Sequence, residues 1–320
     1  MSTLDWLLNP ITAKDFFEQF FEQNPLLIQR DQMDYYDSIL SIKDIEHVID
    51  LGKNLSNFDI NQSTSDGALD DNLYSFVVQE HNIKIKTGID KIKIKQLLHK
   101  QKCPIVISHV HNALPKLKEF IDQLSIALDG NCYADMFITP PLVSKGFGIH
   151  FDLNDVYVMQ LYGNKRWEIY ESFGYLPDQP HFYYGFKRDD SKYRKLLSID
   201  LEAGNFLYLP RGFIHNVTTR NKLSIHLTIG CLNRKWSDVL TRFNGELASR
   251  FDVLGQKVST TIFNNSCNDL QEIRRIFETE LTMKALESCH KNLKERNSGA
   301  DRPHITSILC SSKSDAATIK

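Results

Sequence analysis

The chain has 320 residues, enough for one large domain and a smaller one. Hydrophobic residues make up 42% and aromatic residues 11% of the composition, so a packed core is expected and global disorder is excluded. The 38 basic and 40 acidic residues leave a formal net charge of −2, which excludes a generic polyanion binder. We expect no direct nucleic-acid binding, because even the lysine-rich stretch 84–102 is typical of a solvated strand edge and helix face.

The cysteines and the first residues of the chain predict a cytoplasmic protein. No window has the roughly 18 consecutive apolar residues that a membrane span needs, and no basic start is followed by the apolar stretch of a secretion signal. The six cysteines are scattered and form no C-x-x-C pair. This pattern is typical of reduced thiols and argues against a disulfide framework or a thiolate zinc site.

Helical and extended patterns alternate over the first 130 residues. Thr12 and Ser41 each precede apolar residues at helical spacing, so they predict the starts of two helices. The polar stretch 52–72 predicts a loop. Apolar runs and one amphipathic stripe then predict, in order, strands at 74–78, 83–86 and 105–111 and a helix over 114–124.

The region 131–230 consists of short apolar runs separated by turn signals such as Gly163-Asn164 and Gly204-Asn205. Many short strands with regular turns are typical of a β-sandwich or β-barrel. Beyond Lys235 the apolar spacing becomes helical, and after Asn297 the chain is polar, which predicts a frayed tail.

The chemistry of the chain centres on His150 and Asp152. In extended backbone the residues i and i+2 project to the same face, so this imidazole and this carboxylate can reach one metal ion. The third candidate ligand is His215, which follows a turn, an apolar strand and a second turn. That layout can return a distant histidine across a β-barrel to the first pair.

A set of two histidines and one carboxylate suits ferrous iron better than zinc. Such a triad on one face of the ion leaves open positions for a bidentate cosubstrate and dioxygen, which is typical of ferrous oxygenases. Zinc more often has three protein ligands and one water in a tetrahedral site.

Six segments carry a family pattern in their order and spacing: 24–28, 133–140, 150–152, 156–167, 204–215 and 224–230. Together they resemble the JmjC-type 2-oxoglutarate oxygenases, and among these the ribosomal-oxygenase (cupin-4-like) branch. The resemblance covers most of residues 1–230. It implies a mainly β fold with α elaborations, a double-stranded β-helix of the jelly-roll or cupin type, followed by a C-terminal helical region.

The resemblance also implies roles for particular residues. Fe(II) would bind His150, Asp152 and His215, which would be the catalytic centre, with 2-oxoglutarate as cosubstrate and O₂ as oxidant. Lys165 would hold the distal carboxylate of 2-oxoglutarate, and Thr139 and Thr228 would contact the same cosubstrate. The reaction implied is decarboxylation of 2-oxoglutarate to succinate with hydroxylation of an amino-acid side chain in a protein or peptide.

An argument from the residues supports the role of Lys165. The Gly163-Asn164 signal predicts a two-residue hairpin turn that pairs Tyr162 with Lys165. Residues 158, 160 and 162 would then share a face with 165, 167 and 169. If that face lines the barrel, Lys165 is an interior cation and needs an anionic partner. Trp167 is expected in the core.

The sequence departs from the family at three positions near the expected site, one of which is Ile149 in place of a frequent proline. Asp135 and Phe137 stand where relatives commonly carry asparagine and tyrosine, so polar contacts near the substrate or cosubstrate are expected to differ. His226 is either an interior residue near the metal or a satisfied core histidine, and the sequence favours neither. The pair His109 and His111 is expected to be structural, because no third ligand accompanies it.

We expect three parts: an oxygenase domain over 1–230, a helical region over 231–298 that either makes a homodimer or lies on the barrel, and a flexible tail over 299–320. The polypeptide substrate would be a ribosomal protein or a precursor peptide; the short segment after Gly230 favours the peptide. No membrane partner is expected. Two alternatives stay open: a cupin-fold metal enzyme of another reaction class, and a JmjC-like binding module without catalysis.

Overall fold

The structure of the protein, a computed structural model, describes residues 1–51, 60–62, 71–81, 83–100, 102–142, 148–174, 176–177, 186–255 and 268–297. Most of the expected loop 52–72, all of the expected tail 299–320 and two of the cysteines, Cys267 and Cys310, lie outside these residues. The chain divides into two compact units, 1–233 and 234–320. Within the described ranges, no helix is both long and apolar enough to cross a membrane.

Local sequence signals start the N-terminal helices. Helix α1 (Thr3–Leu8) has Ser2 as its N-cap, and α2 (Ala13–Gln19) has Thr12, whose hydroxyl accepts a hydrogen bond from the Asp15 amide at 3.1 Å. Strand β1 (Leu26–Ile28) follows. Helix α3 (Ile42–Leu51) begins directly after Ser41. Both predicted helix starts are confirmed.

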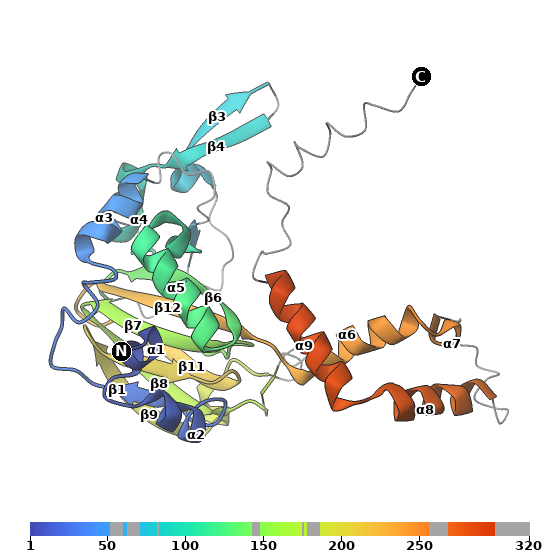
Figure 1. Ribbon diagram of the computed structural model, residues 1–320. Helices are drawn as coiled ribbons and strands as arrows, with labels where there is room; N and C mark the ends of the chain where they lie inside the picture. The colour runs from blue at the N-terminus through green and yellow to red at the C-terminus, as the bar shows by residue number, and fades with distance from the viewer. Residues whose placement is uncertain are drawn as a thin grey trace. The chain divides into compact units, whose positions relative to one another are not determined.

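The next segments add a hairpin and two covering helices to the first unit (Figure 1). Their bounds are β2 (Ile60–Gln62), η1 (Asp71–Leu73), β3 (Ser75–Glu80), β4 (Ile83–Ile89), α4 (Lys91–His99), β5 (Ile105–Ile107), η2 (Val110–Ala113) and α5 (Pro115–Ala127). The prediction of a loop over 52–72 is wrong at Ile60–Gln62, which form strand β2. The predicted strand 105–111 ends at Ile107, because His109 takes a left-handed backbone (φ 54°) and caps η2.

Two antiparallel sheets form the centre of the first unit. The larger has the order β1-β10-β7-β12-β6-β5-β2 and the smaller the order β11-β8-β9. The strands not yet bounded are β6 (Gly130–Thr139), β7 (Asp155–Tyr162), β8 (Asn164–Ser172), β9 (Lys195–Glu202), β10 (Phe206–Leu209), β11 (Phe213–Thr218) and β12 (Ser224–Asn233), and the short η4 (Asp190–Lys192) precedes β9.

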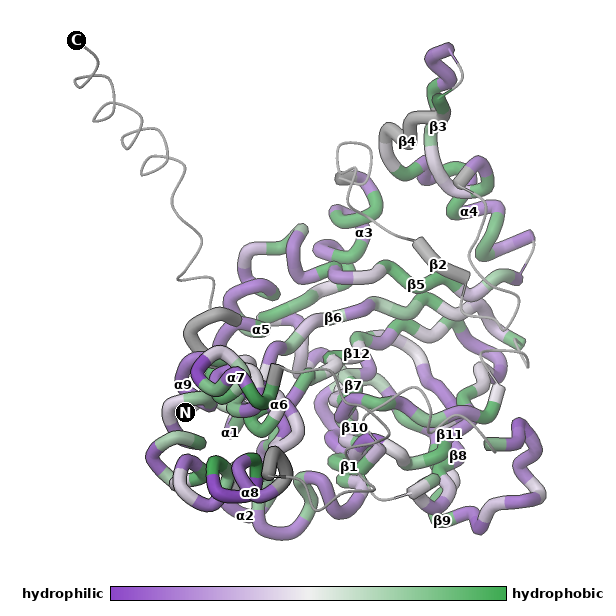
Figure 2. Tube along the Cα trace, turned by 90° about the vertical axis from the view of Figure 1, so that its right-hand side faces the viewer, coloured by the Kyte–Doolittle hydropathy of each residue, from purple (hydrophilic) through white to green (hydrophobic). Residues whose placement is uncertain are grey.

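The buried residues of the strands form two separate interiors. Figure 2 shows the hydropathy of each residue along these strands. On β6 the even-numbered residues Cys132, Ala134, Met136 and Ile138 pack with the apolar faces of α1 and α5 on the outer side of the large sheet. A second cluster lies between the sheets and joins Val156, Val158, Leu207 and Leu209 of the large sheet to Trp167, Ile169 and Leu201 of the small one. The two sheets therefore face each other, as the predicted double-stranded β-helix requires.

The expected hairpin at Gly163 is wrong. Strands β7 and β8 belong to different sheets, and Lys165 pairs with Leu201 of β9 instead of with Tyr162, which is 48% exposed. Gly163 (φ +63°) turns the chain from one sheet to the other, and a Cβ there would lie 1.9 Å from the backbone oxygen of Leu223. Lys165 nevertheless faces the interior, because alternation along β8 places it with Trp167 and Ile169.

The second unit is helical. It comprises α6 (Trp236–Ala248), α7 (Asp252–Gly255), α8 (Asn268–Glu280) and α9 (Met283–Asn297). Its buried residues are Val239, Phe243, Leu247, Ile276 and Cys289. The helical spacing seen beyond Lys235 therefore corresponds to packed helices.

Candidate active site

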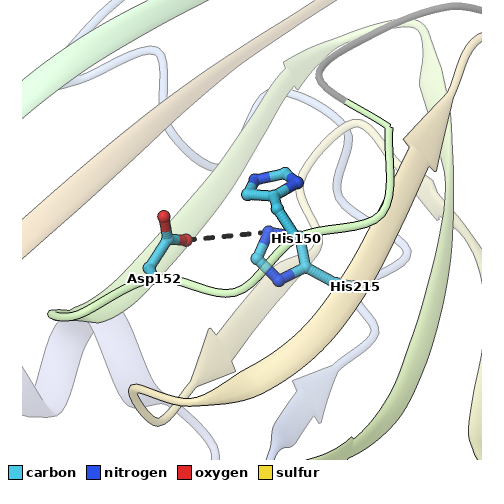
Figure 3. A group of neighbouring side chains, drawn as sticks. All are labelled: His150, Asp152 and His215. Atoms are coloured by element: carbon cyan, nitrogen blue, oxygen red, sulfur yellow. Dashed lines mark ion pairs between the residues drawn. The ribbon is translucent and has the colours of Figure 1, made fainter. Parts of the chain in front are cut away.

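His150, Asp152 and His215 come together in the first unit. One ligand atom from each lies within 4.8 Å of the others, and they form the sole group of this kind in the part of the chain that the structure describes. Figure 3 shows the three side chains converging, with Asp152 Oδ2 at 3.6 Å from His215 Nε2. The three residues that the sequence suggested as ligands are thus close enough to bind one ion.

Backbone hydrogen bonds bring these residues together. His150 and His215 form an antiparallel bridge in which each amide donates to the other's carbonyl, at 3.0 and 2.8 Å. The Gly212 amide donates to the Asp152 carbonyl at 2.9 Å, so the turn before β11 also holds the third ligand. A register shift between Phe213 and His215 places the imidazole on the inner face of β11.

The imidazoles are oriented for metal binding. His150 Nδ1 lies 2.8 Å from the Gly148 carbonyl, and His215 Nδ1 lies 3.0 Å from the Phe213 carbonyl. A ring N–H that donates to a carbonyl leaves Nε2 of the same neutral ring free for a metal. Burial and the nearby His150 lower the pKa of His215 to about 4, so its ring is neutral and its lone pair available at neutral pH.

A buried polar network stabilises the turn before β11. Asp155 accepts hydrogen bonds from the Arg211 amide, at 2.9 Å, and from the Asn233 side chain. The Arg211 guanidinium is 8% exposed and pairs with Glu22 at 2.9 Å. The turn that positions Asp152 and His215 is therefore tied both to the end of β12 and to the N-terminal segment.

The three ligands border a cavity of about 430 Å³. Its walls come from both sheets: Pro104, Tyr133, Asp135, Phe137, Thr139, Gly148, His150, Asp152, Leu153, Asn154, Val156, Lys165, Trp167, His215, Val217, His226 and Thr228. A cavity of this size between two sheets suits a small polar ligand beside a metal ion.

Lys165 lies in the cavity wall and is 5% exposed. Its ammonium donates to the Thr139 hydroxyl at 3.1 Å, and among the described residues no carboxylate pairs with it. Burial lowers its pKa to about 7. A buried amine without a counter-charge at the edge of a cavity fits an anionic ligand.

Four more residues line the cavity, of which the sequence had assigned a cosubstrate role to Thr228 alone. His226 lies at the cavity, as one of its two open interpretations had it, and Trp167 borders the cavity and stacks on His215 (ring centroids 5.6 Å apart). Thr228 and Asp135 also line it, and Asp135 accepts from the His109 amide at 2.8 Å while burial raises its pKa. The signal for these residues was the alternation along β6, β8 and β12, which alone could not distinguish a cavity face from a second core face.

His111, by contrast, belongs to the outer core. It is 8% exposed, and its Nδ1 accepts a hydrogen bond from the Ala134 amide at 3.3 Å. It is not a member of the metal-ligand group found among the described residues.

Comparison with known proteins identifies the domain. A family model described as the JmjC domain matches residues 109–239, which include the three ligands and Lys165. Residues 109–239 are a JmjC domain. The resemblance recognised in the sequence is confirmed.

The JmjC domain has relatives among named oxygenases. The chain is 29% identical over 245 residues to the bifunctional lysine-specific demethylase and histidyl-hydroxylase NO66 of Drosophila mojavensis, covering 71% of this chain and 24% of the relative. It is 27% identical to ribosomal oxygenase 1 of Danio rerio (74% and 42% covered) and 28% identical to ribosomal oxygenase 2 of Mus musculus (75% and 49% covered). The chain spans less than half the length of each of these relatives.

Solved structures match most of the chain in fold. The structure of Escherichia coli YcfD superposes with a TM-score of 0.56 at 14% identity, covering 89% of this chain and 72% of that one. A YcfD structure in complex with cobalt and 2-oxoglutarate gives a TM-score of 0.53 at 14% identity, with 88% and 70% covered. The predicted double-stranded β-helix is confirmed by this likeness.

Proposed function

We propose that the chain is an Fe(II)- and 2-oxoglutarate-dependent oxygenase that hydroxylates an amino-acid side chain of a protein or peptide. The observation that carries the proposal is the buried Lys165 in the wall of the same cavity as the His150, Asp152 and His215 triad. A triad that leaves coordination positions open and a nearby buried cation are together what a chelating dicarboxylate needs. The named activities of the relatives support the same class.

The polar side chains of the cavity fit both ferrous iron and 2-oxoglutarate. Two neutral imidazoles and one carboxylate suit ferrous iron. Trp167 and His226 also line the cavity, and two buried ring nitrogens of these residues, Trp167 Nε1 and His226 Nδ1, have no hydrogen-bond partner among the described residues. Buried polar atoms are usually paired, so these fit a ligand rich in oxygen atoms.

The roles of the residues follow from their positions. His150, Asp152 and His215 would hold the iron, and the carbonyl contacts of the two rings would keep their Nε2 atoms directed at it. Lys165, with Thr139, would orient 2-oxoglutarate by its distal carboxylate, and Thr228 would border it. Iron with 2-oxoglutarate and O₂ would supply an oxidative decarboxylation in which CO₂ leaves, one oxygen atom enters succinate and the other enters a C–H bond of the substrate. The cavity walls would exclude bulk water.

The direct test is turnover of the cosubstrate. Purified chain loaded with Fe(II) should convert 2-oxoglutarate to succinate and should do so faster with a suitable peptide pool. A zinc or manganese enzyme of another class would contain that metal after purification and would form no succinate. A binding module would bind a polypeptide partner equally well with and without Asp152. Either result would overturn the proposal.

The charge state of Lys165 predicts a pH dependence of cosubstrate binding. Since its pKa in the free protein is about 7, the ammonium loses its proton as the pH rises above 7, and only the protonated form attracts a carboxylate. We expect the Kd for 2-oxoglutarate to rise above pH 7, by up to about 10-fold per pH unit. Titration calorimetry in buffers of different ionisation enthalpy should show proton uptake on binding. A Kd that is constant from pH 6 to 9 would contradict this.

The substrate is proposed to be a polypeptide, either a ribosomal protein or a precursor peptide. The names of the relatives, ribosomal oxygenase and histidyl-hydroxylase, favour the ribosomal protein. Mass spectrometry of polypeptides that co-purify with the chain should reveal a gain of one oxygen atom on a single residue. The absence of any such product in ribosomal proteins would shift the proposal to a peptide.

We propose that the second unit makes a homodimer. Its helices leave large apolar side chains exposed: Trp236 (67%), Leu240 (41%), Leu281 (47%) and Met283 (67%). Exposed apolar residues of this size are typical of association surfaces. Ending the chain after Asn233, which keeps the Asn233 bond to Asp155, should convert dimers to monomers in sedimentation velocity. An unchanged number of chains per particle would contradict the dimer.

We also propose a cytoplasmic location. The six cysteines are scattered along the chain and form no C-x-x-C pair, a pattern typical of a reducing compartment. Cys132 Sγ and Cys231 Sγ lie 3.3 Å apart on neighbouring strands. Thiol labelling of the freshly purified, denatured chain should modify all six cysteines, and protection of this pair would argue against the location.

A further inference from the structure

His226 is a buried polar residue that the roles given above leave without a function. It lies on β12, is 2% exposed, and its Nδ1 has no hydrogen-bond partner in the described part of the chain. Two aromatic rings pack against it: the Phe137 ring stacks on it at 4.7 Å between centroids, and the Trp167 ring meets it edge-on at 6.0 Å. A buried ring nitrogen without a partner is costly unless a ligand completes it.

The surroundings of His226 identify the ligand group. His226 is paired in register with Phe137 on β6, and Thr139 lies two residues further along the same face. Lys165 Nζ lies 5.7 Å from the centre of the Phe137 ring and 3.1 Å from the Thr139 hydroxyl. The imidazole, the ammonium and the hydroxyl therefore surround one end of the cavity.

The chemistry of this end is complementary to a carboxylate. Burial and the Lys165 ammonium hold the pKa of His226 well below its usual range, so the ring is neutral and carries one N–H. Phe137 has no donor to offer there. A carboxylate has two oxygens, and one ammonium with one hydroxyl leaves room for another donor.

We infer that His226 is a binding residue for the distal carboxylate of the cosubstrate, to which its ring N–H donates a hydrogen bond beside the Lys165 ammonium. The inference rests on the proposed function, because it takes 2-oxoglutarate as the ligand. His226 would then discriminate a dicarboxylate from a monocarboxylate 2-oxo acid, since only the former reaches this end of the cavity.

The test compares two 2-oxo acids with two variants. His226→Phe keeps the ring and its stacking but removes the N–H, whereas His226→Gln keeps a donor. With Mn(II) bound, calorimetry should show that His226→Phe binds 2-oxoglutarate about 10-fold more weakly, a loss typical of one hydrogen bond to a charged group, and that His226→Gln loses less. Binding of 2-oxobutyrate, which lacks the distal carboxylate, should change in neither variant.

The matched control is His111→Phe, which alters another buried histidine that lies outside the cavity. It should lower the melting temperature and leave the Kd for 2-oxoglutarate unchanged. If His226→Phe does not fold, ¹⁵N-histidine spectra of the unaltered protein with Zn(II) replace it: 2-oxoglutarate, but not 2-oxobutyrate, should shift the His226 ring resonances and slow exchange of its N–H.

Three outcomes separate the claims. Equal losses for both 2-oxo acids, or none for 2-oxoglutarate, would overturn the role of His226 and leave the proposed function intact. If the His226 ring resonances do not shift in a protein that binds 2-oxoglutarate, the role of His226 is likewise overturned and the proposed function stays intact. Failure of the unaltered, metal-loaded protein to bind 2-oxoglutarate would overturn both.

Discussion

Asp152→Ala should abolish hydroxylation while leaving the fold intact. Asp152 is the single carboxylate in the ligand group, so its removal leaves two neutral imidazoles to hold the ion. Loss of a residue that merely supports a ligand costs about 10- to 100-fold in metal affinity or activity, and loss of a ligand should cost at least the upper figure. Mass spectrometry of a co-expressed substrate should then show no gain of an oxygen atom, and bound metal after dialysis should fall to background.

The control for Asp152→Ala is Asp122→Ala. Asp122 lies exposed on α5, where it pairs with Lys118 at 2.8 Å, an interaction worth only about 0.3–0.5 kcal/mol. This variant should keep its metal and its product. Full product formation by Asp152→Ala at normal metal occupancy would mean that the triad is not the iron site.

Lys165→Met should weaken cosubstrate binding and stabilise the fold. The ammonium is buried with one hydroxyl partner, so methionine of similar length removes the group proposed to pair with the distal carboxylate. We expect the 2-oxoglutarate concentration for half-maximal turnover to rise about 100-fold, with metal affinity changed by less than about 2-fold, since a charged hydrogen-bonded pair is worth about 1.5–3 kcal/mol. Equal effects on the two ligands would reject the assigned role.

The stability gain of Lys165→Met should depend on pH in a defined direction. The pKa of Lys165 is lower in the folded protein than in the unfolded chain, so the unfolded chain binds more protons between pH 7 and about 10. The unfolding free energy of the unaltered protein therefore rises through this window. The excess melting temperature of the variant, measured by calorimetry, should be largest below pH 7 and shrink toward pH 10. The exposed Lys116→Met is the control and should show no such trend.

Much of the site could be predicted because its residues lie in short local patterns. The spacing of His150 and Asp152, the turn signals before His215, and the caps at Thr12 and Ser41 act over a few residues. Resemblance to a family then supplied the link between His150 and His215, which are far apart in the chain. Spacing alone could not have supplied it, because an i, i+2 pair is common in strands that bind nothing.

The hairpin prediction at Gly163 failed for a physical reason. A Gly-Asn signal indicates a backbone that needs a positive φ, but the same φ serves a tight hairpin and a crossing from one sheet to the other. The available partner strands decide whether a hairpin or a crossing forms. Here β8 pairs with β9 and β11, whereas β7 pairs with β10 and β12.

The sequence by itself determined the types of ligand, the helix starts and the two-residue alternation of the strands. Tertiary structure alone decided that the inner face of β6, β8 and β12 surrounds a cavity, so that Trp167 and His226 face a ligand site beside Lys165. The physical reason is that alternation tells which residues share a face of a strand. It does not tell which of two buried faces is filled by side chains and which is left open by the closing of two sheets.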